Sequence, residues 1–214
     1  MGKFEEGVNG TFTGKVGAVV AYKWRDIKVM RSLARPSTKP RSPKQLANQA
    51  KMKLMQKLLK LTVDFVRTGF SLDPSTARMS EFNLAMSYNI KNAIKGDYPD
   101  TEIDFEKFMF AQGDLEPPKD LLFQQKGNLL EITWDPKTAI LRNTEDQIMW
   151  CLIDADVEEL VGEVFGERRI KGVVSRNLDG FDLKKEYHCF AAFVAGDRNQ
   201  VSDSGYYGTI TFES

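Results

Sequence analysis

The chain has 214 residues, of which 42% are hydrophobic and 28% charged, and its 30 Lys and Arg balance its 30 Asp and Glu. These values are ordinary for a soluble globular protein that can bury a real core. Three features exclude other classes: no apolar run reaches the roughly eighteen residues of a membrane span, residues 1–6 lack the hydrophobic segment of a secretory signal, and Cys151 and Cys189 are too few for a disulfide framework. We expect a cytoplasmic protein, or one exported or released as part of an assembly without a classical signal peptide.

The zero net charge hides a strong asymmetry along the chain. Residues 1–60 contain 14 Lys and Arg against three acidic residues, a net charge of +11. The remaining residues carry 16 basic and 27 acidic side chains, a net charge of −11. Such polarity favours contact within the chain, head-to-tail assembly of copies, or a polyanion at the basic end.

The N-terminal region predicts a basic β-hairpin. Residues 15–24 alternate apolar side chains as a strand does, residues 25–26 suit a tight turn, and residues 27–33 return as a second strand. The basic residues of the hairpin and of the linker after it, with one tryptophan, form a candidate basic partner surface: Lys15, Lys23, Trp24, Arg25, Lys28, Arg31, Arg35, Lys39 and Arg41.

A proline-rich linker leads into one long predicted helix over residues 43–69. Ser42 and Gln45 form a capping box around Pro43, and Gly69 offers a C-terminal stop. Apolar residues at helical spacing predict the core face: Ala47, Ala50, Leu54, Leu58, Leu61 and Phe65, widened by Met55, Leu59 and Val66. The opposite side carries Lys53, Lys57, Lys60 and Arg67. We interpret it as a solvated face, with a functional basic ridge as the alternative.

A second helix is predicted from about residue 75 or 80 to residue 95, ended by Gly96. Its buried stripe is Phe82, Ala85, Met86, Ile90 and Ala93. We expect the two helices to pack as an antiparallel pair. Hairpin, linker and helices together make a predicted N-terminal domain over residues 1–116.

From Ile103 the pattern changes to short alternating segments separated by turn signals. These segments predict strands at residues 103–111, 121–124, 129–134, 147–154, 159–165, 169–174, 187–194 and 208–212. Their number and spacing suit a β-sandwich. Because Pro117-Pro118 marks a composition break, the second predicted domain covers residues 117–214.

Two stretches of this domain resemble the fibronectin type III family. Residues 130–136 (LEITWDP) are similar to its second strand, and residues 183–192 (LKKEYHCFAA) to the leucine-to-tyrosine corner before its sixth strand. The resemblance covers residues 118–214 and implies a core position for Tyr187, with Cys189, Ala191 and Phe193 also inward. The expected fold class is α+β: a basic hairpin and two-helix unit, then a fibronectin type III-like, immunoglobulin-like antiparallel sandwich. Such a resemblance implies no function.

The whole chain also resembles an uncharacterised bacterial family, a domain of unknown function. The resemblance rests on Gly14-Lys-Val-Gly-Ala-Val-Val20, on Trp24 and Arg31, on Lys39-Pro-Arg-Ser-Pro-Lys-Gln45, and on Phe82-Asn-Leu-Ala-Met-Ser-Tyr-Asn-Ile-Lys-Asn92. Lys39 departs from the family pattern, where asparagine is expected. The resemblance implies the architecture and no activity.

Elimination argues against an enzyme, and we expect no catalytic residue, cofactor, metal or small-molecule substrate. His188 is the only histidine, and adjacent strand residues face opposite ways, so His188 cannot activate Cys189. One histidine and two distant cysteines make a zinc site improbable, and free buried thiols are the favoured interpretation.

Two function classes remain. The first is a structural or interaction protein that assembles with copies of itself or a protein partner, as a component of a surface, filament or virus particle. A candidate acidic rim would receive the basic end of a neighbouring copy: Asp154, Asp156, Glu158, Glu159 and Glu163. The alternative is a nucleic-acid-binding protein that uses the basic N-terminal 60 residues, where Tyr22 and Trp24 could stack on bases.

Overall fold

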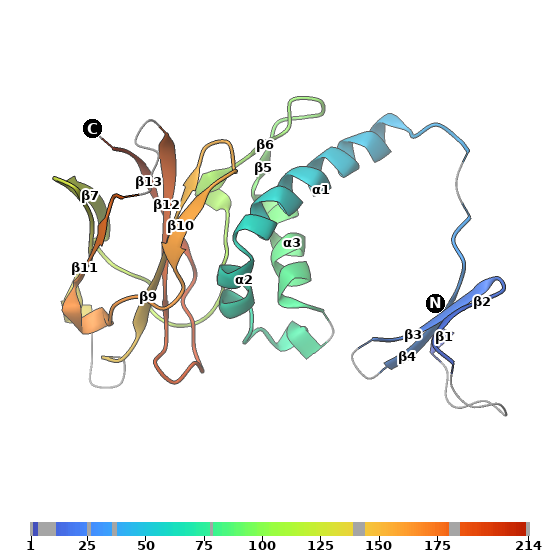
Figure 1. Cartoon of the computed structure of the whole chain (residues 1–214), viewed down its shortest axis with the longest axis horizontal. Coiled ribbons are helices and arrows are strands. Elements are labelled where there is room, and N and C mark those ends of the chain that lie inside the picture. The colour runs from blue at the N-terminus through green and yellow to red at the C-terminus, as the bar shows by residue number, and fades with distance from the viewer. Residues whose placement is uncertain are drawn as a thin grey trace. The chain divides into compact units, whose positions relative to one another are not determined.

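The chain divides into two compact units, Met1–Ser42 and Pro43–Ser214. A computed structural model describes residues 2–3, 12–24, 27–35, 38–77, 79–138, 144–179 and 185–212 (Figure 1). Over these residues it has mixed α and β content, with three α-helices and several antiparallel sheets. The predicted domain boundary at residues 116–117 falls inside the second unit.

The first unit holds an antiparallel sheet in the order β1-β4-β3-β2. Its strands are β1 (Gly2–Lys3), β2 (Gly14–Val16), β3 (Val19–Trp24) and β4 (Ile27–Ser32). The predicted pairing of β3 with β4 is confirmed, with Trp24 opposite Ile27, while the turn at residues 25–26 lies outside the described residues. A single strand over residues 15–24 was wrong. Gly17, with φ of +57°, turns the chain back, so that β2 and β3 form a second hairpin.

The predicted helix over residues 43–69 is two helices, α1 (Pro43–Leu61) and α2 (Val63–Gly69). Thr62 separates them with φ of −95° and ψ of 20°. Its buried hydroxyl donates to the carbonyl of Leu58 over 3.1 Å, and such local side-chain bonds compete with regular helix. The predicted core face is confirmed from Leu54 onward, where Met55, Leu58 and Phe65 are buried, but Ala47 and Ala50 are half-buried and outside the core.

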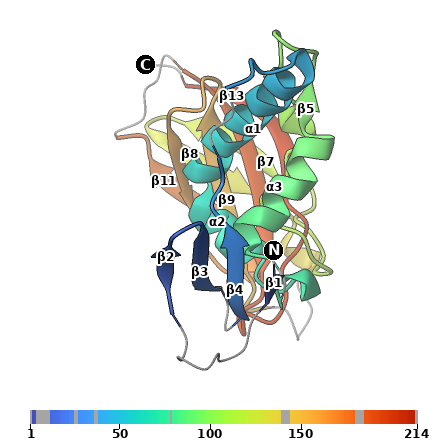
Figure 2. The same ribbon diagram turned by 90° about the vertical axis from the view of Figure 1, so that its right-hand side faces the viewer.

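The second predicted helix is α3 (Glu81–Asn92). Ser80 is its N-cap and accepts a hydrogen bond from the amide of Asn83 over 3.3 Å. A 3₁₀ turn, η1 (Pro74–Ala77), precedes it. After α3 the chain forms the short pair β5 (Ile94–Lys95) and β6 (Glu102–Ile103), so residues 94–95 are strand and not helix. Figure 2 shows α1 and α3 beside each other.

The predicted strand over residues 103–111 was also wrong. Only Ile103 is in a strand, and the 3₁₀ turn η2 (Phe105–Lys107) follows. The backbone of Met109 bonds instead with the buried side chain of Asn89, whose Nδ2 donates to its carbonyl over 2.7 Å and whose Oδ1 accepts from its amide over 2.9 Å. The side chain of Asn89 thus makes the two backbone hydrogen bonds that a neighbouring strand would make to Met109. Phe108 and Phe110, on either side of Met109, are buried in the core.

Among the described residues of the C-terminal part, seven strands form two antiparallel sheets. One sheet has the order β11-β8-β7, from β7 (Leu122–Lys126), β8 (Leu129–Thr133) and β11 (Val173–Asn177). The other has the order β10-β9-β12-β13, from β9 (Gln147–Asp154), β10 (Leu160–Glu163), β12 (Glu186–Val194) and β13 (Gly205–Thr211). The segment predicted as a strand at residues 169–174 is the 3₁₀ turn η4 (Arg169–Lys171) followed by β11, and the short turn η3 (Pro136–Thr138) follows β8.

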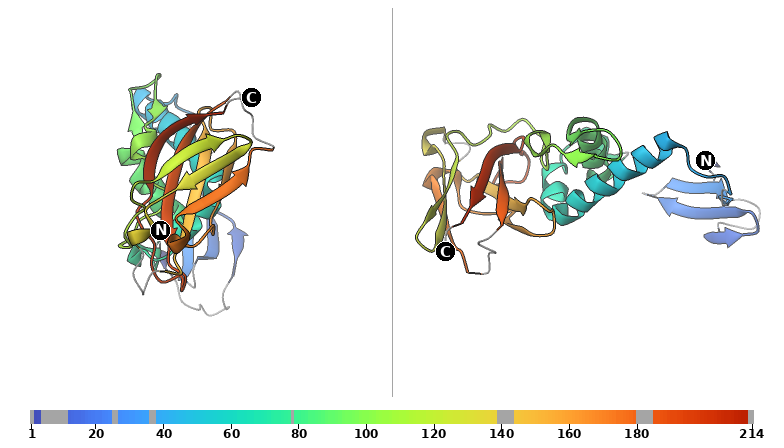
Figure 3. Two further views of the ribbon diagram at one scale, coloured as in Figure 1. Left: turned by 90° about the vertical axis from the view of Figure 1, so that its left-hand side faces the viewer. Right: turned by 90° about the horizontal axis from the view of Figure 1, so that it is seen from above.

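The four-stranded sheet is covered on both faces, which gives the second unit three layers (Figure 1). On one face, Trp150, Tyr187 and Phe193 pack with Trp134, which follows β8, and with the β11-β8-β7 sheet, which lies in front in the left panel of Figure 3. On the other face, Cys151 and Phe190 pack against the helices. The predicted core position of Tyr187 is confirmed, and Trp134 is buried as well. Double burial explains why residues 148–153 are apolar without alternation.

Candidate functional site

The candidate basic surface of the first unit is spread over both faces of its sheet. The strand register places Lys15, Val20 and Arg31 in one row, and successive strand residues alternate between faces, so Tyr22 and Trp24 share that face. We name it the aromatic-basic face. Lys15 and Arg31 are exposed, and Trp24 is 41% exposed. This arrangement brings two aromatic rings and two cations to one side of the sheet.

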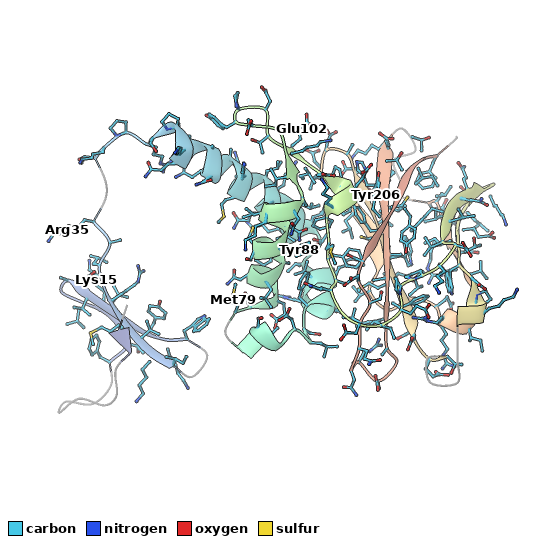
Figure 4. The ribbon with its side chains drawn as sticks, turned by 180° about the vertical axis from the view of Figure 1, so that it is seen from behind. Lys15, Arg35, Met79, Tyr88, Glu102 and Tyr206 are labelled. Atoms are coloured by element: carbon cyan, nitrogen blue, oxygen red, sulfur yellow. The ribbon has the colours of Figure 1, made fainter. Side chains whose placement is uncertain are left out.

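The other basic candidates lie elsewhere. Lys23 and Lys28 are opposite each other on the second face of the sheet. Arg35, Lys39 and Arg41 are exposed along the linker; Figure 4 labels Arg35 there and Lys15 on the sheet. Arg25 lies outside the described residues. The eight candidates that the structure describes therefore do not form one patch on one face.

A basic helix end, residues 43–53 of α1, adds Lys44 and Lys51 to Lys53 of the predicted basic side. Lys44 and Lys51 are seven residues apart, about two turns, so they lie on one helix face, which continues as the buried Met55 and Leu58. This face is apolar from residue 54 onward, and it is basic in the two turns before residue 54. Lys44, Lys51 and Lys53 make no ion pair within the described part of the chain.

The prediction that Asp154 belongs to an exposed acidic rim was wrong, because Asp154 is a buried structural carboxylate. Its side chain is 1% exposed, and its Oδ1 accepts the backbone amides of Glu158 and Glu159, each over 2.7 Å. Burial raises the pKa of Asp154, but these two bonds and the nearby ammonium of Lys185 outweigh it, and the pKa lies below its ordinary value. Asp154 holds the turn between β9 and β10.

Three of the remaining rim carboxylates have cationic neighbours in the same chain. Glu163 receives two hydrogen bonds from the guanidinium of Arg176, over 2.5 and 2.6 Å. Glu159 lies 3.3 Å from the Lys185 ammonium, and Glu158 lies 3.9 Å from that of Lys57. Lys57 also donates to the backbone carbonyl of Asp156 over 2.6 Å. The rim is therefore largely neutralised within the chain, with Asp156 as an exposed carboxylate.

A larger acidic feature lies where β9 begins. An open hollow of about 1150 Å³ is lined by five carboxylates and one guanidinium, which leaves four negative charges on its lining. We name it the acidic hollow; its charged residues are Asp114, Glu116, Glu145, Asp146, Asp197 and Arg168. These residues come from four separate segments of the chain, so sequence patterns alone could not group them.

Three carboxylates of the acidic hollow have a cationic neighbour, either in the lining itself or in the protein behind it. Arg168 donates to Glu145 over 3.1 Å, and Lys119 pairs with Glu116. Asp146 is 3% exposed and lies 3.3 Å from Nε of the fully buried Arg169, without a hydrogen bond between them. Burial raises the pKa of Asp146, against the effect of Arg169. The exposed Asp114 has no ion pair among the described residues.

Arg169 joins the acidic hollow to the core between the sheets. Its guanidinium lies 3.9 Å from the ring centre of Phe193, and Nη2 donates to the carbonyl of Glu116 over 2.7 Å. Its own carbonyl accepts from the indole of Trp134 over 2.7 Å. Arg169 was predicted only as the start of a strand, and nothing in the local sequence marks it as a buried cation.

The sole histidine lies outside both charged features. The His188 ring stacks on Phe105 with ring centres 3.7 Å apart, and its Nδ1 lies 3.1 Å from the hydroxyl of Tyr206. Burial lowers its pKa. Figure 4 labels Tyr206 on β13. Cys189 faces the opposite side of β12, toward the other sheet, so the predicted separation from His188 is confirmed.

Comparison with known families matches almost the whole chain. A model of a family of unknown function, DUF6266, covers residues 11–208. The chain belongs to the DUF6266 family. A comparison with curated proteins gave no match. The family model supports the resemblance expected over the whole chain and assigns no activity to it.

Two further observations describe this DUF6266 member. Among the residues that the structure describes, no group of three or more His, Cys, Asp or Glu side chains could hold a metal ion. No helix in the same part of the chain combines the length and apolarity needed to cross a membrane. Cys151 and Cys189 are free and buried as predicted, and burial raises the pKa of both thiols, that of Cys189 to about 12.

Proposed function

We propose that this DUF6266 protein is a non-enzymatic structural or interaction protein that assembles with copies of itself or with a protein partner. The observation that carries the proposal is the distribution of unpaired charge. The rim carboxylates are largely neutralised inside the chain, whereas Lys44, Lys51 and Lys53 on α1 have no ion pair among the described residues. Cations displayed in this way favour an external anionic partner.

The strand order supports a finer proposal for the C-terminal part, that it is a fibronectin type III-like sandwich. Three strands in the order β11-β8-β7 face four in the order β10-β9-β12-β13, and Trp134 and Tyr187 lie in the core between them. In this proposal the sandwich is a docking module. A role in surfaces, filaments or virus particles rests on analogy with other sandwiches of this class.

Mass photometry or light scattering across protein and salt concentrations tests the self-assembly form of the proposal. Attraction between exposed charges is screened beyond about 8 Å at physiological salt, so assemblies should be largest at low salt and shrink as salt is added. A strict monomer at high protein and low salt concentration would refute self-assembly and leave a foreign protein partner.

A second candidate function is nucleic-acid binding by the N-terminal region, including possible stacking on single strands. The aromatic-basic face favours it, because Tyr22 and Trp24 lie beside Lys15 and Arg31 on one side of the sheet. Aromatic rings stack on bases while cations contact phosphates.

Titration of a labelled duplex and a labelled single strand at two salt concentrations tests this candidate. The logarithm of affinity should fall with the logarithm of salt concentration by about 0.9 for each duplex phosphate contact. Trp24→Ala should weaken single-strand binding, while Leu33→Ala, an exposed apolar residue after β4, serves as the control. Absence of binding at low salt eliminates this function.

A further inference from the structure

We infer that the basic helix end of one copy, residues 43–53, docks in the acidic hollow of the next copy. This inference rests on the proposed function, and it replaces the acidic rim with a different acceptor surface. Both surfaces belong to the second unit, so the inference needs no knowledge of where the first unit lies.

The face of the basic helix end that continues toward the core is basic, which suits an anionic partner. Leu54 packs on the core and Met55 is the first fully buried residue of α1, so the helix before them lies outside the core. On the face that continues toward Met55, the two preceding turns carry Lys44 and Lys51. Two copies of this face would repel each other, which argues against pairing of α1 with α1.

The position of Lys44 costs helix stability. The first turn of α1 contains no acidic residue, and a cation near the positive end of the helix dipole is unfavourable. The helix spans about 14 Å from residue 43 to residue 52 at 1.5 Å per residue. It also exposes Met52, at 51%, and Leu46, at 36%. These side chains could contact apolar atoms of a concave acceptor.

The acidic hollow matches this helix end in charge. Of its five carboxylates, Glu116, Glu145 and Asp146 have cationic neighbours, whereas Asp114 and Asp197 have no ion pair among the described residues, so the lining keeps a net negative charge. Leu115 and Ala195 add apolar atoms to the lining. Asp146 lies buried behind the lining beside the Arg169 guanidinium, so the exposed carboxylates of the lining are the ones that a docked helix would meet.

The two surfaces lie at different ends of the second unit. Lys57 contacts Asp156, just beyond the last residue of β9, whereas Asp146 and Gln147 of the hollow lie at its first residue. An eight-residue strand spans about 24 Å. Figure 3 shows, from above, α1 extending away from the sheets. The helix end therefore cannot reach the hollow of its own copy, and the contact is head-to-tail, which generates rings or open filaments.

Charge reversal with cross-rescue tests the inference on the full chain. The helix variant is Lys44→Glu with Lys51→Glu, and the hollow variant is Asp114→Lys with Glu145→Lys. All four residues lie outside the buried core. Each variant alone should associate at least about tenfold more weakly than the unmodified protein, because exposed charge contacts become repulsive. An equimolar mixture should recover assembly, since the acidic helix end then meets a basic hollow.

Two matched variants carry the same changes of charge at other places. Lys60→Glu with Lys91→Glu changes two exposed helix lysines, and Asp156→Lys with Glu158→Lys changes the rim. Both should assemble as the unmodified protein does. Recovery of assembly in the mixture also shows that the two reversed proteins are folded.

The outcomes separate this inference from the proposed function. Assembly that survives the hollow variant but is lost in the rim variant overturns the inference and retains self-assembly through the rim. Equal loss in all four variants indicates a general effect of charge and also overturns it. An unmodified protein that stays monomeric at low salt refutes the inference together with self-assembly.

Discussion

Asp154 shows how a residue that resembles a surface charge in sequence can be a structural one. Asp154 and Glu159 stand in one acidic stretch, yet the former accepts two amides and is buried, while the latter pairs with Lys185 near the surface. Only the pairing of β9 with β10 creates this difference, because it turns the chain around the carboxylate of Asp154.

The lowered pKa of Asp154 gives a prediction about pH. A carboxylate with a lower pKa in the folded state stabilises the fold fully above its unfolded pKa, near 3.9, and loses this contribution as pH falls through the folded value. Asp154→Asn should therefore lower the free energy of unfolding at pH 7 by about 1–3 kcal/mol. Urea titrations at pH 7 and below pH 4 should show the difference shrinking on acidification. The exposed Asp156→Asn is the control, and an unchanged difference at both pH values would contradict the assignment.

Arg169 gives a second prediction at the scale of one residue. Removing one partner of a buried ion pair costs about 3–5 kcal/mol, because the other charge remains buried. Arg169→Ala should lower stability by this amount, while Arg169→Met with Asp146→Leu should lower it less, since it removes both charges and keeps apolar volume. Thermal unfolding of the unmodified protein, of Arg169→Ala and of the double variant measures these differences in stability. A single variant no less stable than the double would show that the pair is not coupled.

At the scale of elements, Asn89 of α3 replaces a strand partner for Met109. Asn89→Leu should remove both hydrogen bonds and destabilise the chain by about 1–3 kcal/mol for each buried group left without a partner. Asn92→Leu, three residues later and exposed, should change stability by about 0.5 kcal/mol or less. Chemical unfolding measures both. Equal effects of the two variants would argue against the role of Asn89.

Local patterns predicted those elements whose causes are local. Ser80 was a candidate start of the second helix because an N-cap needs only its own neighbours, and β9 was predicted over residues 147–154 as one of the short segments separated by turn signals. At Thr62 the hydroxyl shares the Leu58 carbonyl with the residue's own amide, a contact that often bends a helix, and the loss of the strand at residues 103–111 goes with the contact of Asn89 to Met109, twenty residues later. Periodicity carries no information about either contact.

In the candidate site, too, the features that depend on local sequence were predicted, and those that depend on contacts between distant residues were not. The sequence located the basic end correctly as a charge imbalance, because net charge is additive over a segment. It could not show that Glu163 binds Arg176 or that Asp114 and Glu145 line one hollow, since these relations follow from topology. Residues 148–153, apolar at every position, did hold a signal for a doubly covered strand.

At the scale of the molecule, the three layers change the expected behaviour of fragments. A fragment of residues 118–214 would expose Met149, Cys151 and Phe190, which pack against the helices. We predict that residues 43–214 fold as a cooperative unit, while residues 118–214 alone bind a hydrophobic dye and aggregate. Thermal unfolding followed by circular dichroism tests whether each fragment folds cooperatively, and dye fluorescence reports its exposed apolar surface. A soluble 118–214 fragment with a sharp melting transition would instead support the predicted boundary at residues 116–117.

The strands β9 and β12 form a wall that two cores share. Because Trp150 belongs to one core and its neighbour Cys151 to the other, neither the helices nor the outer sheet can detach without uncovering this wall. Its amides should therefore be the last in the protein to exchange with deuterium, at a free energy equal to that of global unfolding. Substitution of a core residue in either outer layer, such as Phe110 or Trp134, should therefore speed the exchange of these same amides.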